Sequence, residues 1–181
     1  MFLDDFHRLD VPKQDRRRRM EAEANRFAAA LLMPAAKLRA AMRTSAPDLH
    51  QIVRLAREFD VSKEAMARTY VEAQREPVAV LILHHGRIQR IYRGEDVPWI
   101  TSQPNRNVPT TSLASGHRLQ PGNSSEILEC DPDVCFGDRD ARRIEMATEQ
   151  LLAQGNGFSM LLIHVELGDE EEADAPNWPR R

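Results

Sequence analysis

One stretch of this sequence limits the possible folds more than any other, the run Met20–Pro34, MEAEANRFAAALLMP. Apolar residues recur in it at the spacing of one helix face, and a proline ends the run, so it predicts an amphipathic helix. Glu21 and Asn25 are four positions apart and therefore lie one turn apart on a common side of this helix. We expect the apolar members to form one buried stripe: Met20, Ala24, Phe27, Ala28 and Leu31.

The two polar residues beside this stripe have two interpretations. In the first, Glu21 and Asn25 are solvated surface residues. In the second, Glu21 is a metal ligand, and Asn25 supports the site from behind through a hydrogen bond. The spacing alone is compatible with both.

Residues 21–34 carry the pattern E-x-E-A-N-x-F-A-x-x-L-L-M-P, which closely resembles the ImmA/IrrE family of zinc metallopeptidases. In that family one helix carries H-E-x-x-H, with two zinc-binding His and a general-base Glu, and an E-x-x-A-N/D-x-F-A-x-x-L-L-M-P helix supplies the third ligand. The resemblance implies that Glu21 is that third ligand and that Asn25 is the polar partner of a liganding His. It also implies which residues form the core of the motif helix: Phe27, Ala28, Leu31, Leu32, Met33 and Pro34.

The chain departs from the family because it contains no H-E-x-x-H segment. None of its 6 His begins that pattern: His7, His50, His84, His85, His117 and His164. A catalytic zinc site needs three protein ligands and an open position for water, so we expect this chain alone to bind no zinc and to be inactive as written. Family spacing places the missing helix just before Met1, so we expect an N-terminally truncated or mis-started chain, or a degenerate family member.

The resemblance implies a zinc-dependent metallo-endopeptidase of the ImmA/IrrE type, with zinc as cofactor and a helix–turn–helix repressor as the protein substrate. Two alternatives remain open. The chain is a non-catalytic regulatory scaffold that binds such a repressor, or it is a DNA-binding protein that uses residues 47–73. The resemblance also implies that the repressor is cleaved under stress or on induction of a mobile element.

Within residues 47–73, the segment LAREFDVSKEAMART resembles a helix–turn–helix unit, with Ser45 or Asp48 able to cap its first helix and Ser62 its second. The second helix offers Lys63 and Arg68 but also two Glu, and it has no Asn or Gln near its start to read adenine. We therefore favour a packing role over DNA binding, and we expect no nucleic-acid partner.

The pattern of the second half of the sequence predicts strands. We therefore expect an α+β fold, in which a helical peptidase-like remnant is followed by a mixed or antiparallel sheet. VAVLILHHGRIQRIYRG reads as a hairpin that turns at His85-Gly86, and FSMLLIHVEL as a central strand because it is apolar on both faces. ARRIEMATEQLLAQGNG fits a helix or a strand, whereas SSEILEC and VCF read as short strands. We divide the chain into a helical region 1–75, an α/β and regulatory region 76–168, and a disordered acidic tail 169–181.

The composition agrees with an ordinary globular chain of 181 residues, with 41% hydrophobic residues, 29% charged residues and a formal net charge of −3. It has no apolar run long enough for a membrane span and no signal-peptide core, so we expect a cytoplasmic location and no membrane partner. Cys130 and Cys135 are expected to be reduced thiols. Loss of the first catalytic helix should expose Phe27 and Leu31, and this exposed surface favours an oligomer.

Overall fold

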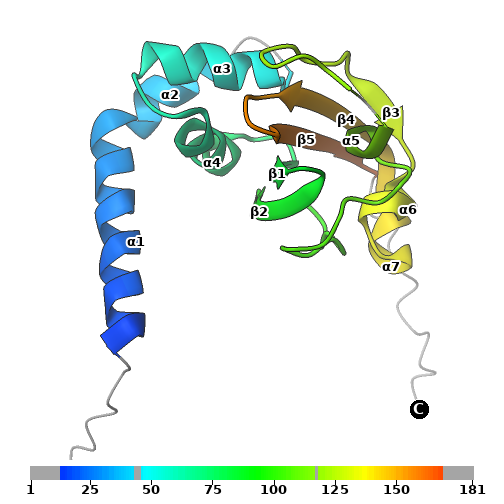
Figure 1. The fold of residues 1–181 in the computed structure, drawn as a ribbon, viewed down its shortest axis with the longest axis horizontal. Helices are drawn as coiled ribbons and strands as arrows, with labels where there is room; N and C mark the ends of the chain where they lie inside the picture. The colour runs from blue at the N-terminus through cyan, green and yellow to red at the C-terminus, as the bar shows by residue number, and fades with distance from the viewer. Residues whose placement is uncertain (1–12, 43–45, 117, 169–181) are drawn as a thin grey trace, which may run out of the picture.

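The computed structural model describes residues 13–42, 46–116 and 118–168, and the predicted acidic tail lies outside them. Helices come first and a five-stranded antiparallel sheet follows, which confirms the predicted α+β class. In Figure 1 the long first helix stands apart from the sheet, and only its C-terminal end approaches the other helices. Among the described residues, no helix combines the length and the apolar character that crossing a membrane requires.

The helical part contains α1 (Lys13–Leu32), α2 (Ala35–Met42), α3 (Leu49–Glu58) and α4 (Lys63–Ala73). The predicted caps are present, since Asp48 accepts a hydrogen bond from the backbone N of His50, and Ser62 accepts one from that of Ala65. The other predicted cap, Ser45, lies outside the described residues. The prediction that Leu38 and Met42 share a buried side of α2 is also confirmed.

The sheet has the strand order β2-β1-β5-β4-β3. Its strands are β1 (Val78–His84), β2 (Arg87–Arg93), β3 (Leu128–Cys130), β4 (Ile144–Ala153) and β5 (Phe158–Leu167). β1 and β2 form the predicted hairpin, and the left-handed φ of His85 (48°) and Gly86 (75°) suits its two-residue turn. β5 lies between β1 and β4, which confirms its predicted central position.

Two predictions in this half need correction or completion. The VCF segment is not a strand, because Pro132 begins the short helix α6 (Pro132–Cys135) and Asp131 caps it. The ambiguous segment before the Gly155–Gly157 turn is the strand β4, which pairs along its length with β5. Two other short helices, α5 (Leu113–Gly116) and α7 (Asp138–Ala141), accompany α6 near the far end of the sheet (Figure 1).

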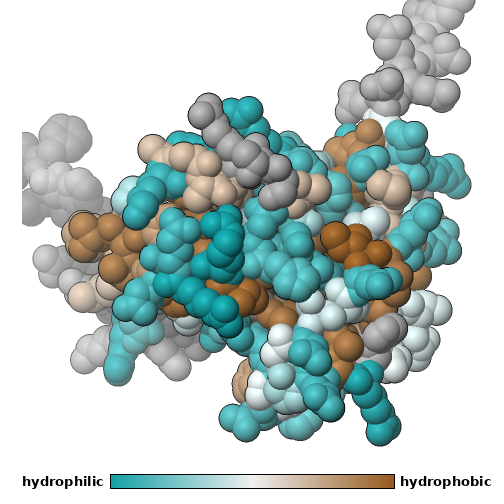
Figure 2. All heavy atoms as spheres, turned by 90° about the horizontal axis from the view of Figure 1, so that it is seen from above, coloured by the Kyte–Doolittle hydropathy of each residue, from teal (hydrophilic) through white to brown (hydrophobic). Residues whose placement is uncertain are grey.

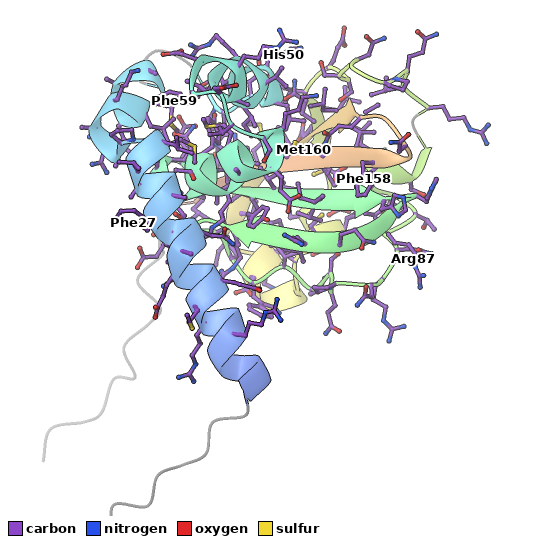
Figure 3. The ribbon with its side chains drawn as sticks, turned by 60° about the vertical axis from the view of Figure 1, so that its left-hand side comes forward. Phe27, His50, Phe59, Arg87, Phe158 and Met160 are labelled. Atoms are coloured by element: carbon purple, nitrogen blue, oxygen red, sulfur yellow. The ribbon has the colours of Figure 1, made fainter. Side chains whose placement is uncertain are left out.

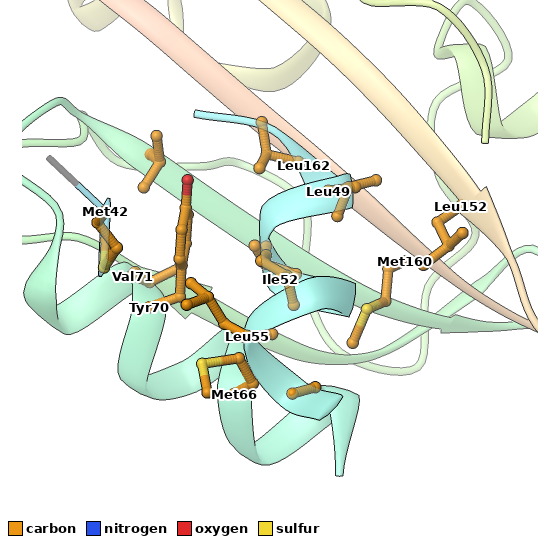
Figure 4. Packing of buried hydrophobic residues seen from close by; sticks show 14 of the residues in the cluster. Met42, Leu49, Ile52, Leu55, Met66, Tyr70, Val71, Leu152, Met160 and Leu162 are labelled. Carbon is orange, nitrogen blue, oxygen red and sulfur yellow. The ribbon is translucent and has the colours of Figure 1, made fainter. Parts of the chain in front are cut away.

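The sheet separates two hydrophobic cores. One core joins α2, α3 and α4 to one face of β1, β4 and β5, with Tyr70, Ile52 and Met66 fully buried beside Met160 and Leu162 (Figure 4). The other core lies between the opposite face and the segments that include α5, α6 and α7. Because β5 supplies side chains to both cores, its middle is a continuous buried apolar run from Met160 to Ile163.

Candidate functional site

The predicted ligand helix forms, but its apolar stripe is exposed. Phe27 is 72% exposed, Leu31 is 69% exposed and Met20 is 62% exposed, whereas Met33 at the end of the helix is only 3% exposed. The prediction that Met20, Ala24, Phe27, Ala28 and Leu31 are buried is therefore wrong, since all five are exposed. The physical reason is that α1 contacts the remaining described residues only near its C-terminal end (Figures 1 and 3). The separate expectation that Phe27 and Leu31 are exposed in this chain is confirmed.

The two polar residues of the motif lie on the accessible part of α1. Glu21 is exposed, and its carboxylate accepts a hydrogen bond from Arg17 Nε at 3.3 Å one turn earlier in the helix. Such an exposed pair contributes little to stability because water screens it. Asn25 is also exposed. Both side chains are therefore accessible to a ligand, although their geometry does not by itself define one.

A groove of about 300 Å³ runs between the C-terminal half of α1, the helix α4 and the strand β2. The wall formed by α1 is polar at Asn25 and apolar at Ala28 and Leu32, and Met33, directly after the helix, continues its apolar part. The opposite wall carries charged and aromatic side chains: Glu64, Arg68, Arg90 and Tyr92. The motif helix thus forms one side of a half-apolar groove with charged groups opposite. Apolar residues also reach the molecular surface between hydrophilic ones in Figure 2.

The charges in this groove are linked through Glu64. Its carboxylate Oε1 accepts hydrogen bonds from Arg90 Nη1 at 2.9 Å and from the Tyr92 hydroxyl at 2.8 Å. Burial and the hydrogen bond to Glu64 raise the pKa of Tyr92. The hydrogen bond to Tyr92 and the charge of Glu64 raise the pKa of Arg90. The two hydrogen bonds to Glu64 fix this wall of the groove.

The described residues do not assemble a zinc site. Among them no group of three or more His, Cys, Asp or Glu side chains is arranged to hold a metal ion. The carboxylate of Glu21 is hydrogen-bonded to Arg17 rather than to a further ligand. Zinc bound by the described part of the chain would lack two of the three protein ligands that a catalytic site needs.

The helix–turn–helix-like unit is packed against the sheet. α4 buries Met66, Ala67, Tyr70 and Val71 against its neighbours, and it contacts both β1 and β2. Near its N-terminus, where a recognition helix would read bases, Glu64 is held by two residues of β2. This arrangement favours the packing interpretation of residues 47–73.

Two polar clusters were not evident from the sequence. In one, Glu149 on β4 is 1% exposed and accepts hydrogen bonds from the Ser112 hydroxyl at 3.0 Å and the Leu113 N–H at 2.6 Å. Cys135 Sγ donates to the same carboxylate at 3.6 Å. Burial, with the nearby charge of Glu149, raises the pKa of Cys130 to about 12 and that of Cys135 even further. The predicted free thiols are confirmed.

The second cluster contains Asp48, His50 and Ser124. Their side chains form a continuous hydrogen-bonded chain from α3 to the loop before β3. The sequence predicted Asp48 only as a helix cap. No sequence signal places Ser124 beside His50, because the two residues are 74 positions apart in the chain.

Comparison with known families confirms the resemblance carried by α1. Residues 6–70 match the model of the peptidase family M78, described as the IrrE N-terminal-like domain, so the chain is consistent with an ImmA/IrrE family member. A comparison with curated proteins finds no match. The matched segment spans α1 to most of α4 and ends before the sheet begins.

Proposed function

We propose that this chain carries the third-ligand helix of an ImmA/IrrE-type zinc metallo-endopeptidase that cleaves a helix–turn–helix repressor. The proposal rests on the exposure of α1. Glu21 and Asn25 are exposed on this helix, and so are the large apolar side chains of Phe27 and Leu31. A helix with exposed large apolar side chains is suited to pack against another helix. In the family, that partner carries H-E-x-x-H.

The proposal gives separate roles to Glu21 and Asn25. Glu21 provides one carboxylate oxygen to the metal, and Asn25 orients a liganding His by hydrogen bonding its other ring nitrogen. Because these 181 residues contain no H-E-x-x-H, the remaining ligands must come from a segment outside them. The described residues by themselves then have no peptidase activity, and the zinc site forms only when that segment is present.

The first test is the coding DNA upstream of Met1. An in-frame H-E-x-x-H within one helix length provides a protein on which Glu21 can be examined. In that protein, Glu21→Ala should lose both zinc, measured by elemental mass spectrometry, and cleavage of the repressor. Full zinc occupancy in the Glu21→Ala variant would overturn the assignment.

Glu23 provides a matched control on the same helix. It is a carboxylate of the same length, but it lies about 200° around the helix axis from Glu21, so both cannot face one metal ion. Glu23→Ala should therefore keep zinc and activity. If Glu23→Ala loses zinc while Glu21→Ala keeps it, then Glu23 is the ligand.

A second candidate function is a non-catalytic scaffold that binds a repressor without cleaving it. The groove between α1, α4 and β2 supports this candidate, because it offers an apolar wall and fixed charges without metal. The chain as written should then bind a purified repressor in calorimetry and leave it intact. Leu32→Glu, which places a charge in the groove, should abolish binding, whereas Lys37→Glu on the exposed side of α2 should not.

DNA binding by residues 47–73 is the weakest of the three alternatives. The packing of α4 on the sheet leaves the start of that helix engaged with Arg90 and Tyr92. A salt-dependent affinity for duplex DNA would favour this function, since phosphate contacts release counterions. We expect no such affinity at low salt.

A further inference from the structure

Three side chains brought together from two distant segments have the connectivity of an activated serine. Ser124 Oγ lies 2.7 Å from His50 Nε2, and His50 Nδ1 lies 2.9 Å from Asp48 Oδ1 and 3.2 Å from Asp48 Oδ2. The nucleophile thus contacts a base, and a carboxylate orients the base from its other side. This pairing of contacts is the geometric criterion for nucleophilic catalysis by serine.

The carboxylate is held in place by the start of α3. Asp48 is the N-cap residue, and its Oδ1 also accepts the backbone N–H of His50 at 2.8 Å. Partial burial opposes ionisation, but hydrogen bonds from the His50 N–H, from Gln150 and from the His50 ring together lower the pKa of Asp48. An ionised Asp48 assigns the proton of neutral His50 to Nδ1, and Nε2 is then free to accept the Ser124 proton.

The backbone around Ser124 fixes the position of its hydroxyl. Ser124 pairs with Leu152 of β4 in an antiparallel bridge. The hydrogen bonds lie on either side of this pair. The N–H of Ser125 donates to Leu151 O at 2.8 Å, and the N–H of Ala153 donates to Asn123 O at 2.9 Å. Ser124 is therefore the non-hydrogen-bonded member of an antiparallel pair. Its side chain shares the face of Leu152, on which α3 packs, and its own N–H points away from β4.

We propose that Ser124, His50 and Asp48 form a second active site that takes small activated acyl compounds such as aryl esters. Ser124 is the nucleophile, His50 is the general base and acid, and Asp48 is a positioning residue. The outward Ser124 N–H is a donor for the developing oxyanion. The site lies in the open, since the His50 side chain is 66% exposed, and this openness favours small substrates over polymers (Figure 3).

The reaction conserves its atoms and protons within this set of residues. Ser124 Oγ forms a bond to the acyl carbon while its proton passes to His50 Nε2. The bond from carbon to the leaving oxygen then breaks, and His50 returns the proton to the departing alcohol. Water next attacks the acyl carbon and passes a proton to His50 Nε2. The bond from the acyl carbon to Ser124 Oγ then breaks, and His50 returns that proton to Ser124 Oγ. Release of the carboxylic acid restores Ser124, so the net reaction is ester and water to acid and alcohol.

The experiment exposes the full chain to a fluorophosphonate probe and locates the adduct by peptide mass spectrometry, with p-nitrophenyl acetate hydrolysis as a second measurement. The adduct should lie on Ser124, and Ser124→Ala and His50→Gln should each lower labelling at least about tenfold, within the loss that removal of a triad member causes. Ser115→Ala, which removes another exposed serine, should leave the rate unchanged. Far-UV circular dichroism of each variant establishes that it is folded.

Asp48→Asn separates positioning from a merely structural role, because asparagine can still cap α3. This variant should slow labelling at least about tenfold and change the His50 tautomer in ¹⁵N nuclear magnetic resonance, as expected when the carboxylate that selects the tautomer is lost. The proposal is overturned if the folded wild-type chain forms no adduct on Ser124, or if Asp48→Asn labels at the wild-type rate. Addition of a zinc chelator should not affect labelling, so this result is independent of the peptidase proposal.

Discussion

The side-chain oxygen Oε1 of Gln150 accepts a hydrogen bond from the backbone N–H of Leu49 at 2.7 Å. Gln150 is on β4 and only 2% exposed, whereas Leu49 is the first residue of α3. The first N–H groups of a helix have no partner within the helix, so an acceptor from elsewhere must satisfy them when they are buried. This hydrogen bond therefore links the start of the helix–turn–helix-like unit to strand β4 of the sheet.

Replacing Gln150 with Leu should lower the free energy of unfolding by about 1–3 kcal/mol, because the buried N–H of Leu49 loses its acceptor. Urea unfolding followed by circular dichroism measures the difference. Gln103→Leu is the matched control, since Gln103 is exposed, and it should change stability by less than about 0.5 kcal/mol. Equal losses in the two variants would show that the contact does not stabilise the fold.

The free-standing α1 should respond to mutation differently from the packed α2. Phe27→Ser and Leu31→Ser remove exposed side chains, so each should change the unfolding free energy by less than about 0.5 kcal/mol. Leu38→Ala in α2 leaves a cavity at a residue that is 0% exposed and should cost about 2–5 kcal/mol. Thermal unfolding of the three variants measures this contrast.

The same α1 variants examine self-association. Because Phe27 and Leu31 expose apolar area, we expect the wild-type chain to associate at high concentration and Phe27→Ser to associate less. Light scattering after size exclusion gives the mass of each species. A monomeric wild-type chain at all concentrations would contradict the expectation of an oligomer.

Local sequence signals predicted the elements of this fold well. The turn residues His85-Gly86 and the caps Asp48 and Ser62 each act through the neighbouring backbone, so their positions follow from the sequence. The central position of β5 followed from its two apolar faces. In contrast, the prediction that Phe27 is buried was wrong, because periodicity indicates that a helix face is apolar but not whether another element covers that face.

The candidate site was only partly predictable. The motif helix led to the family that residues 6–70 match, whereas the ligand role of Glu21 remains a prediction. The contact between His50 and Ser124 could not be predicted, because no local pattern specifies which loop closes over the start of α3. The VCF segment was predicted as a strand but lies in and directly after a short helix. Asp131 favours the N-cap and Pro132 the first position of a helix, and together they outweigh the strand preference of Val and Phe.

The two cysteines should be unreactive in the folded protein. Burial, aided by the charge of Glu149, raises the pKa of Cys130 to about 12 and raises that of Cys135 further, so at pH 8 little reactive thiolate is present. A chromogenic disulfide reagent should titrate both thiols rapidly in urea and slowly without it. Rapid reaction of the native chain at pH 8 would contradict the buried environment described for this cluster.

Tyr70 should make the fold sensitive to alkaline pH. Burial raises its pKa to about 12 against an ordinary value of 10.0, and its hydroxyl accepts a hydrogen bond from Gln74 Nε2 at 2.9 Å. Between these two pH values the unfolded chain releases the Tyr70 proton while the folded chain retains it, so stability falls as the pH rises. The full contribution is present below about pH 10, and about 3 kcal/mol is lost by pH 12.

Tyr70→Phe isolates this effect from the thiols of Cys130 and Cys135, which titrate in the same direction because their pKa values are also raised. Urea unfolding at several pH values from 8 to 11 gives the free energy of both proteins. The advantage of wild type over Tyr70→Phe should shrink steadily above pH 10, since phenylalanine has no proton to lose. A constant difference across this range would mean that Tyr70 titrates equally in the folded and unfolded chains, and its hydroxyl would then lie in contact with water.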